Sequence, residues 1–263
     1  MKPRLTINLA AVAANYRLLR ETAGGVAAAS VVKADGYGLG AIPIAERLYQ
    51  EGCRIFFVAT LDEALALRPH IGDATLYVFG GLFGAKPEDF TAHNIRPVLN
   101  ESAEIEVWLR HNLKNCILHV DTGMNRLGLP PSDITVAGGL RPDYVMSHLA
   151  NAETPDDPKN AQQKEAFDTI RKHFPDTPAS LAATAGSLMG ADYAFDLIRP
   201  GIGLYGGNPF AGRPNPLQDV IRIDAPILQI RTLQSGDTVG YGGTFKAMGG
   251  ERIATLGIGY ADG

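Results

Sequence analysis

The chain has 263 residues, of which 45% are hydrophobic and 20% are charged, as is usual for a globular protein. Its net charge of −4 provides no basic surface for nucleic acid or for an anionic membrane. Cys53 and Cys116 form no Cys-x-x-Cys motif and no cluster with histidine, so we expect neither a disulfide framework nor a metal site. A reducing, cytoplasmic location fits this cysteine usage.

The first residues predict a helix that stays in the protein, not a cleaved leader. Lys2 and Arg4 precede an apolar stretch, as in a signal peptide, but Thr6 and Asn8 interrupt it. The apolar spacing then continues in helical fashion through Leu19. No apolar run in the sequence is long enough to span a bilayer.

Short apolar runs alternate with helical patterns along most of the chain. The runs lack strict alternation, as expected of parallel strands that are covered on both faces. Helical patterns lie between them, for example at 42–51, 61–68, 102–112 and 158–174. The expected strands are 28–33, 54–59, 75–79, 95–99, 116–121, 143–148, 179–184 and 201–205. Eight such units predict an α/β fold, a (β/α)8 TIM-type barrel over residues 1–220. An open doubly wound sheet is the alternative, which the lack of a Gly-x-Gly-x-x-Gly motif after the first strand disfavours.

The pattern changes near residue 221. Residues 221–231 alternate like a strand, 235–237 form a turn signal, and 252–258 resemble a further strand. No strong helical pattern follows. We therefore predict that residues 221–263 begin an all-β C-terminal domain. We expect this domain to be incomplete, because the segment is short for a core of its own and its last residues resemble a turn within a domain.

Polar residues lie where the predicted strands end, which is where barrel enzymes carry their catalytic groups. After Lys33, glycines interleaved with Tyr37 allow a backbone to approach a ligand closely. A lysine in a partly apolar site suits Schiff-base chemistry. Pro200 and Gly201 fix a turn whose amides can bind an anion. Taken singly, each feature also fits a surface lysine or a plain turn.

Six segments, taken together and in this order, resemble the alanine racemase family of fold-type III pyridoxal phosphate (PLP) enzymes. The resemblance covers nearly the whole chain and is specific in its combination of motifs. The segments are VVKADGYG at 31–38, DTGMNRLG at 121–128, SHLANA at 147–152, RPGIGLYG at 199–206, VGYGGTF at 239–245 and GIGYADG at 257–263.

The resemblance implies a racemase that uses two bases. Lys33 would bind PLP covalently and, once released by the substrate, act as a base on one face of the α-carbon. Tyr241, supplied by the neighbouring subunit of a homodimer, would be the base on the opposite face. Arg126 would lie near the substrate carboxylate. The implied reaction converts L-alanine and D-alanine into each other and supplies D-alanine for peptidoglycan.

The resemblance also implies how the cofactor is held. Arg199 would contact the pyridine nitrogen and leave it unprotonated, because arginine only donates hydrogen bonds. His148 would link Arg199 towards Tyr241. The phosphate would be bound by Tyr37, Thr184 and the amides of Gly201 and Ile202.

This chain departs from the family pattern at three places. His119 stands where many family members carry a lysine that becomes carbamylated and orients the arginine, which puts the orientation of Arg126 in doubt. Ala183 and Thr184 replace an Asn-Ser pair that is common in the family. Family members also continue beyond the last shared motif.

Other functions fit parts of the pattern. One is a racemase with a wider range of amino acids, and another is a non-catalytic PLP-binding protein of cofactor homeostasis. The Tyr241 motif disfavours the second, because such proteins consist of the barrel alone. A PLP decarboxylase would carry a cysteine late in the chain, and an aldolase of this fold would usually use a metal. The sequence offers neither.

Overall fold

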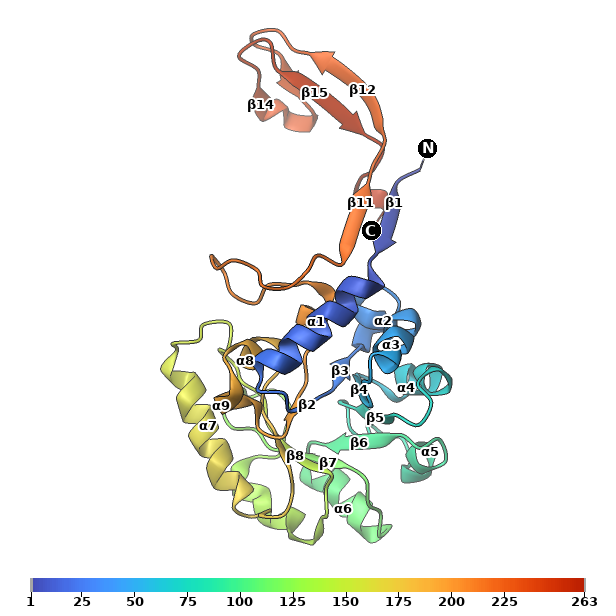
Figure 1. The fold of residues 1–263 in the computed structure, drawn as a ribbon, viewed down its shortest axis with the longest axis vertical. Coiled ribbons are helices and arrows are strands. Elements are labelled where there is room, and N and C mark those ends of the chain that lie inside the picture. Colours follow the sequence, from blue (N-terminus) through green and yellow to red (C-terminus); the bar gives the residue numbers. More distant parts are fainter. Residues whose placement is uncertain (1, 263) are drawn as a thin grey trace. The chain divides into compact units, whose positions relative to one another are not determined.

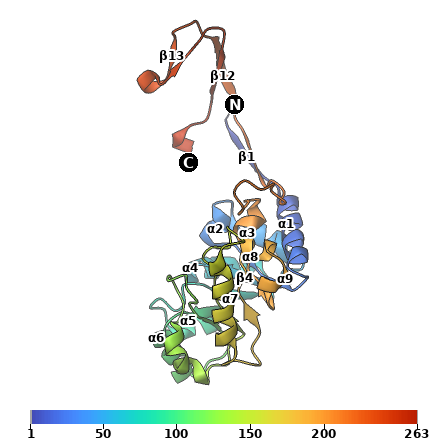
Figure 2. The same ribbon diagram turned by 90° about the vertical axis from the view of Figure 1, so that its left-hand side faces the viewer.

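The structure is a computed structural model that describes residues 2–262 and forms two compact units (Figures 1 and 2). The larger unit is Asn8–Val220. The smaller unit combines residues 2–7 with residues 221–262.

The larger unit is built on a parallel sheet that closes on itself. Seven strands pair in chain order: β3 (Ser30–Val31), β4 (Ile55–Val58), β5 (Thr75–Val78), β6 (Arg96–Leu99), β7 (Ile117–His119), β8 (Tyr144–Met146) and β9 (Ala179–Ser180). β2 (Ala27–Ala28) leads through Ala29 into β3 and pairs in parallel with β10 (Leu197–Ile198). The Arg199 amide donates to the Ala182 carbonyl at 2.9 Å, which joins β10 to the chain after β9. The α/β fold with a TIM-type barrel is therefore confirmed.

The longer helices lie on the outside of these strands (Figures 1 and 2). Asn8 begins the first helix by accepting hydrogen bonds from the amides of Ala10 and Ala11 at 3.0 and 3.1 Å, and Pro158 begins α7 after its cap Asp157. The helices are α1 (Leu9–Thr22), α2 (Lys33–Tyr37), α3 (Ala41–Gln50), α4 (Leu61–Leu67), α5 (Pro87–Thr91), α6 (Ser102–Arg110), α7 (Pro158–Arg171), α8 (Thr184–Leu188) and α9 (Ala191–Ala194). Within residues 2–262, none of the helices is both long and apolar enough to cross a membrane.

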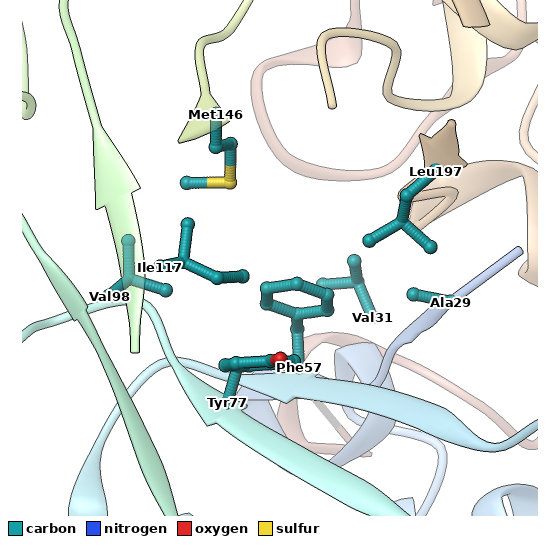
Figure 3. Packing of buried hydrophobic residues seen from close by; sticks show 8 residues of the cluster. All are labelled: Ala29, Val31, Phe57, Tyr77, Val98, Ile117, Met146 and Leu197. Carbon is teal, nitrogen blue, oxygen red and sulfur yellow. The ribbon is translucent and has the colours of Figure 1, made fainter. Parts of the chain in front are cut away.

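The barrel interior is filled by side chains from nearly every strand (Figure 3). The Phe57 ring stacks on Tyr77 at a centroid distance of 5.0 Å and on Phe79 at 4.8 Å. The cluster consists of Ala29, Val31, Phe57, Tyr77, Val98, Ile117, Met146 and Leu197. A packed interior leaves the ends of the strands as the place for a binding site.

The predicted strand at 201–205 is wrong. Ile202–Tyr205 is a 3-10 helix, and the eighth strand is β10, which lies just before it. The amides of Gly201 and Gly203 donate to the Thr184 hydroxyl, each at 3.1 Å, and so leave the sheet ladder. The sequence pattern did not reveal this turn. The apolar residues of the 3-10 helix form a longer run than the two-residue strand β10 before it, and that run resembles a strand.

The smaller unit consists of antiparallel strand pairs. β1 (Arg4–Ile7) pairs with β11 (Ile221–Asp224), β12 (Ile227–Thr232) pairs with β15 (Arg252–Leu256), and β13 (Thr238–Val239) pairs with β14 (Phe245–Lys246). The all-β character predicted after residue 221 is confirmed. The expected helix at the N-terminus begins later than its apolar pattern, because residues 4–7 pair with β11 instead.

The stacked Phe57 ring should be a main source of stability in the barrel. Replacing it with alanine (Phe57→Ala) leaves a cavity between two aromatic neighbours and should cost about 3–5 kcal/mol of unfolding free energy. Urea unfolding followed by circular dichroism measures this loss. Leu65→Ala removes a side chain that is 37% exposed on α4 and serves as the control. Equal losses in both variants would contradict the assigned core.

Candidate active site

A cavity of about 560 Å³ lies at the carboxyl ends of the barrel strands. Its lining includes side chains that directly follow β3, β4, β5, β8 and β10, so it occupies the end of the barrel where active sites form. Eight residues predicted from the sequence line it together: Lys33, Tyr37, Arg126, His148, Thr184, Arg199, Gly201 and Ile202.

Lys33 enters the cavity from an unusual backbone turn. The next four residues have positive φ angles of 53°, 50°, 62° and 57°, which makes Ala34–Tyr37 a left-handed turn. This conformation costs about 1–2 kcal/mol for each residue other than glycine. The Lys33 ammonium group lies 6.0 Å from the centre of the Phe79 ring, over its face. The turn therefore places an amine beside an apolar wall.

The left-handed turn is stabilised by hydrogen bonds from both ends. The Asp35 carboxylate accepts from the Ala41 amide at 2.8 Å, and the Gly36 amide donates to the Val32 carbonyl at 2.9 Å. The Ala34 amide donates to the Glu63 carboxylate at 2.7 Å. These contacts offset the backbone strain and fix where Lys33 leaves the chain.

Arg199 is a buried cation whose partners are neutral. Its side chain is only 2% exposed and donates to the Ser180 hydroxyl and to the carbonyls of Ser147 and Leu181, the last two at 2.7 and 3.3 Å. No carboxylate pairs with it in the part of the chain that the structure describes. Burial lowers the pKa of Arg199 to about 9, so it stays protonated at neutral pH. The cavity therefore contains a fixed donor with unused capacity.

His148 beside this arginine is neutral. Burial first, and then the charge of Arg199, lower the pKa of His148 to about 3. Its Nδ1 lies 3.4 Å from the Arg199 guanidinium, which only donates, so Nδ1 is the acceptor and the proton resides on Nε2. The Gln163 side chain of α7 bonds the His148 carbonyl at 3.0 Å and the Ala150 amide at 2.8 Å. This buried glutamine, which sequence reasoning missed, holds the histidine segment in place.

His119 carries its proton on the other ring nitrogen from His148, on Nδ1 instead of Nε2. Its Nδ1 lies 2.8 Å from the Asn100 side-chain oxygen. The Asn100 amide nitrogen donates to the carbonyls of Phe79 and Val98, so its oxygen must face the ring and Nδ1 must carry the proton. Burial, followed by the charge of Arg199, lowers the pKa of His119 to about 3. His119 thus presents a neutral ring in the cavity wall.

The predicted phosphate end of the cavity is built around one threonine. Thr184 Oγ1 accepts the amides of both Gly201 and Gly203, so the Gly201 amide is already engaged within the protein. A Cβ atom at Gly201 would clash with the Tyr37 hydroxyl, so any other residue there would have to displace the Tyr37 ring. The Ile202 amide makes no hydrogen bond in the described part of the chain. The Ile202 amide, the Thr184 hydroxyl and the Tyr37 phenol therefore surround a small space.

Arg126 lies on a loop that the Asp121 carboxylate organises. That carboxylate accepts the amides of Gly123, Met124 and Asn125 at 2.8–2.9 Å. Arg126 itself is exposed, lines the cavity, and forms no hydrogen bond or ion pair within residues 2–262. Its guanidinium is available to an anionic ligand.

Tyr241 belongs to the smaller unit. It lies in a short 3-10 turn, Tyr241–Gly243, and its side chain is fully exposed. The cavity lining contains residues of the larger unit only. In the described residues, His, Cys, Asp and Glu side chains form no group of three that could hold a metal ion.

Comparisons with known proteins agree with this geometry. The family model "Alanine racemase, N-terminal domain" matches residues 7–209, and "Alanine racemase, C-terminal domain" matches residues 220–263. The alanine racemase of Methylobacterium nodulans is 44% identical over 99% of this chain and 73% of its own length. That of Acidiphilium cryptum is 46% identical over 99% of this chain and 76% of its own.

A solved structure is also similar over the whole chain. The crystal structure of alanine racemase from Bartonella henselae with covalently bound pyridoxal phosphate is 38% identical, with a TM-score of 0.88. The match covers 100% of this chain and 77% of that structure.

The buried, neutral His119 should make the protein sensitive to acid. His119 has a pKa of about 3 in the folded state, whereas an unfolded histidine titrates near ~6.5, so the unfolded state binds more protons between these values. The stability from a neutral His119 is full above ~6.5 and is lost as the pH falls towards about 3. From about pH 7.5 to about pH 5, the wild type should lose about 2 kcal/mol more than His119→Asn.

Asparagine is the informative replacement at this position, because its amide nitrogen can still donate to Asn100. Urea unfolding at both pH values measures the difference. Val98→Ala, a core variant that removes no titratable group, should keep the wild-type pH dependence. A His119→Asn variant with the full acid sensitivity of the wild type would contradict the buried, neutral imidazole.

Proposed function

The chain belongs to the alanine racemase family, and from this premise we propose that it interconverts L-alanine and D-alanine with PLP as its cofactor. One observation carries the proposal: the buried Arg199 has no carboxylate partner among residues 2–262 and shares a cavity with Lys33. An amine for covalent attachment and a donor for an aromatic nitrogen are what PLP requires.

The other cavity residues fit the cofactor as well. Tyr37, Thr184 and the free amide of Ile202 offer donors for a phosphate group. Arg199 donates at every nitrogen, so a pyridine nitrogen held against it would accept a hydrogen bond and stay unprotonated. We propose these residues, together with Gly201 and His148, as the cofactor site.

When PLP is bound, it supplies the electron sink that makes the α-hydrogen of alanine acidic. Lys33, once released by the substrate, would take this proton as an amine or return it as an ammonium on one face of the α-carbon. Tyr241 would take it as a phenolate or return it as a phenol on the other face. Neutral His148 connects Arg199 towards Tyr241 and assists its proton exchange. Arg126, whose guanidinium has no partner in the described chain, binds the substrate carboxylate and orients the α-hydrogen.

The proposal extends to the assembly. Tyr241 lies in the smaller unit and is fully exposed, as a base that serves a neighbouring copy would be. We propose a cytoplasmic homodimer with shared active sites that supplies D-alanine for peptidoglycan. The match of residues 220–263 to a racemase C-terminal domain favours this function over a barrel that only carries PLP.

Lys33 should be required for both cofactor attachment and turnover. The wild type with PLP should convert L-alanine to D-alanine, as measured by a D-amino-acid oxidase assay. Lys33→Ala should lose covalently retained PLP and at least about 100-fold of the activity, because it removes the attachment point and one base. Lys86→Ala, on the loop before α5, is the control. A wild type that retains PLP but does not racemise alanine, serine or other small amino acids would contradict the proposed reaction.

Complementation tests whether Tyr241 acts across subunits. Lys33→Ala and Tyr241→Phe should each be nearly inactive as homodimers. Co-expressed with different tags, they should form mixed dimers with one complete site, which would restore about a quarter of wild-type activity across a statistical mixture. If tandem-purified mixed dimers stay as inactive as the parent variants, Tyr241 does not serve the partner's site.

A further inference from the structure

Two glutamates in this barrel use the same geometry. Glu63 is the third residue of α4 and Glu104 is the third residue of α6, so each stands one turn beyond the strand that precedes its helix. Each carboxylate accepts two backbone amides. Glu63 accepts Ala34 and Ala59, both at 2.7 Å, and Glu104 accepts Leu82 at 2.6 Å and Asn100 at 2.8 Å.

In both cases the two amides come from neighbouring strands. Ala34 follows β3 and Ala59 follows β4, which pair in the sheet. Leu82 follows β5, and Asn100 follows β6. A glutamate at this helix position usually bonds the cap residue of its own helix. Here each side chain instead links the carboxyl ends of two adjacent strands.

The Glu63 link reaches the backbone that carries Lys33. Ala34 is the next residue after Lys33 and the first of the four with positive φ. Ala59, on the other oxygen, lines the cavity itself. One carboxylate therefore holds the start of the left-handed turn against the cavity wall.

We propose that Glu63 is a positioning residue for Lys33. It holds Ala34 in the left-handed conformation and so sets the direction in which the Lys33 side chain enters the cavity. The effect of Glu63 on PLP binding rests on the proposed function, whereas its hydrogen bond to the Ala34 amide does not. Without the carboxylate, the turn would relax towards the right-handed or extended backbone that non-glycine residues prefer.

The link between the two strand ends requires both carboxylate oxygens of Glu63, one for each amide. A glutamine offers one acceptor, and its NH2 group would face the second amide donor. The negative charge also suits this place, because the first turn of a helix favours acidic side chains. In the described chain no lysine, arginine or histidine forms an ion pair with Glu63, so its acceptors serve the two amides.

Hydrogen exchange on the protein without added cofactor tests the contact directly. Glu63→Gln should speed exchange within residues 34–38 by about tenfold or more, since a charge-assisted hydrogen bond to the backbone is lost. Glu104→Gln is the matched control, because it breaks the same kind of link between β5 and β6. It should speed exchange near Leu82 and Asn100 and leave residues 34–38 at the wild-type rate.

Borohydride trapping of PLP then tests positioning. After reduction, mass spectrometry of the peptide that contains Lys33 gives the fraction of lysine that was attached at a limiting PLP concentration. Glu63→Gln should need about tenfold more PLP than Glu104→Gln to reach half-saturation, as follows from loss of one charge-assisted contact. Glu63→Asp, which keeps the charge on a shorter arm, should lie between Glu63→Gln and the wild type, and it replaces Glu63→Gln if that variant does not fold.

Unchanged exchange at residues 34–38 in both Glu63 variants, or an equal increase in Glu104→Gln, would overturn the proposal. Trapping that falls equally in the Glu63 and Glu104 variants would do the same, since it would reflect general loosening of the barrel. If the wild type traps no PLP at Lys33, the proposed function fails, whereas the exchange comparison still decides the role of Glu63.

Discussion

A guanidinium buried among neutral acceptors sets the electrostatic character of this cavity. Arg199 loses its hydration and receives neutral acceptors in return, namely the Ser180 hydroxyl, two carbonyl oxygens and the Nδ1 atom of His148, so a positive potential remains at the mouth of the barrel. His119 and His148 lie in that field and stay neutral because of it and of their own burial. Each ring then has one nitrogen with a proton and one without, and the neighbouring side chain decides which. A site of this kind attracts an anionic ligand whose aromatic nitrogen can accept from Arg199.

The cavity keeps this character only if its walls are rigid and do not rearrange to solvate or pair the Arg199 charge. The walls are loops at strand ends, which are ordinarily the more mobile parts of a barrel. Here side chains cross-link them: Glu63 and Glu104 join neighbouring strand ends, and Gln163 joins the histidine segment to α7. The left-handed turn after Lys33 persists because these contacts outweigh its strain.

The sequence was sufficient to predict the architecture and to select eight residues that line one cavity. Apolar runs located seven strands because buried parallel strands are continuous and apolar, and the glycine-rich motifs marked the residues that now share one cavity. The eighth strand was misplaced since β10 has only two residues and the following apolar residues, Ile202–Tyr205, turn away to bond Thr184. Strand β1 was missed because Arg4–Ile7 is defined by its partner β11, more than two hundred residues away in the chain.

Sequence patterns could not predict the links made by Glu63 and Glu104, for a different reason. Glutamate third in a helix after Thr60 is an ordinary capping signal, and the sequence gives no sign that its side chain instead reaches Ala34 of another strand. Two features together distinguish Glu63. The strand end beside it contains the strained turn Ala34–Tyr37, and Glu63 is an acidic residue in the first turn of the adjacent helix α4. Glu104 bonds Leu82, which lies between Gly81 and Phe83, two residues with positive φ. It also bonds the Asn100 amide, and Asn100 contacts His119 in the cavity wall. The two glutamates therefore share a structural task, and Glu63 is the one that reaches the backbone beside Lys33.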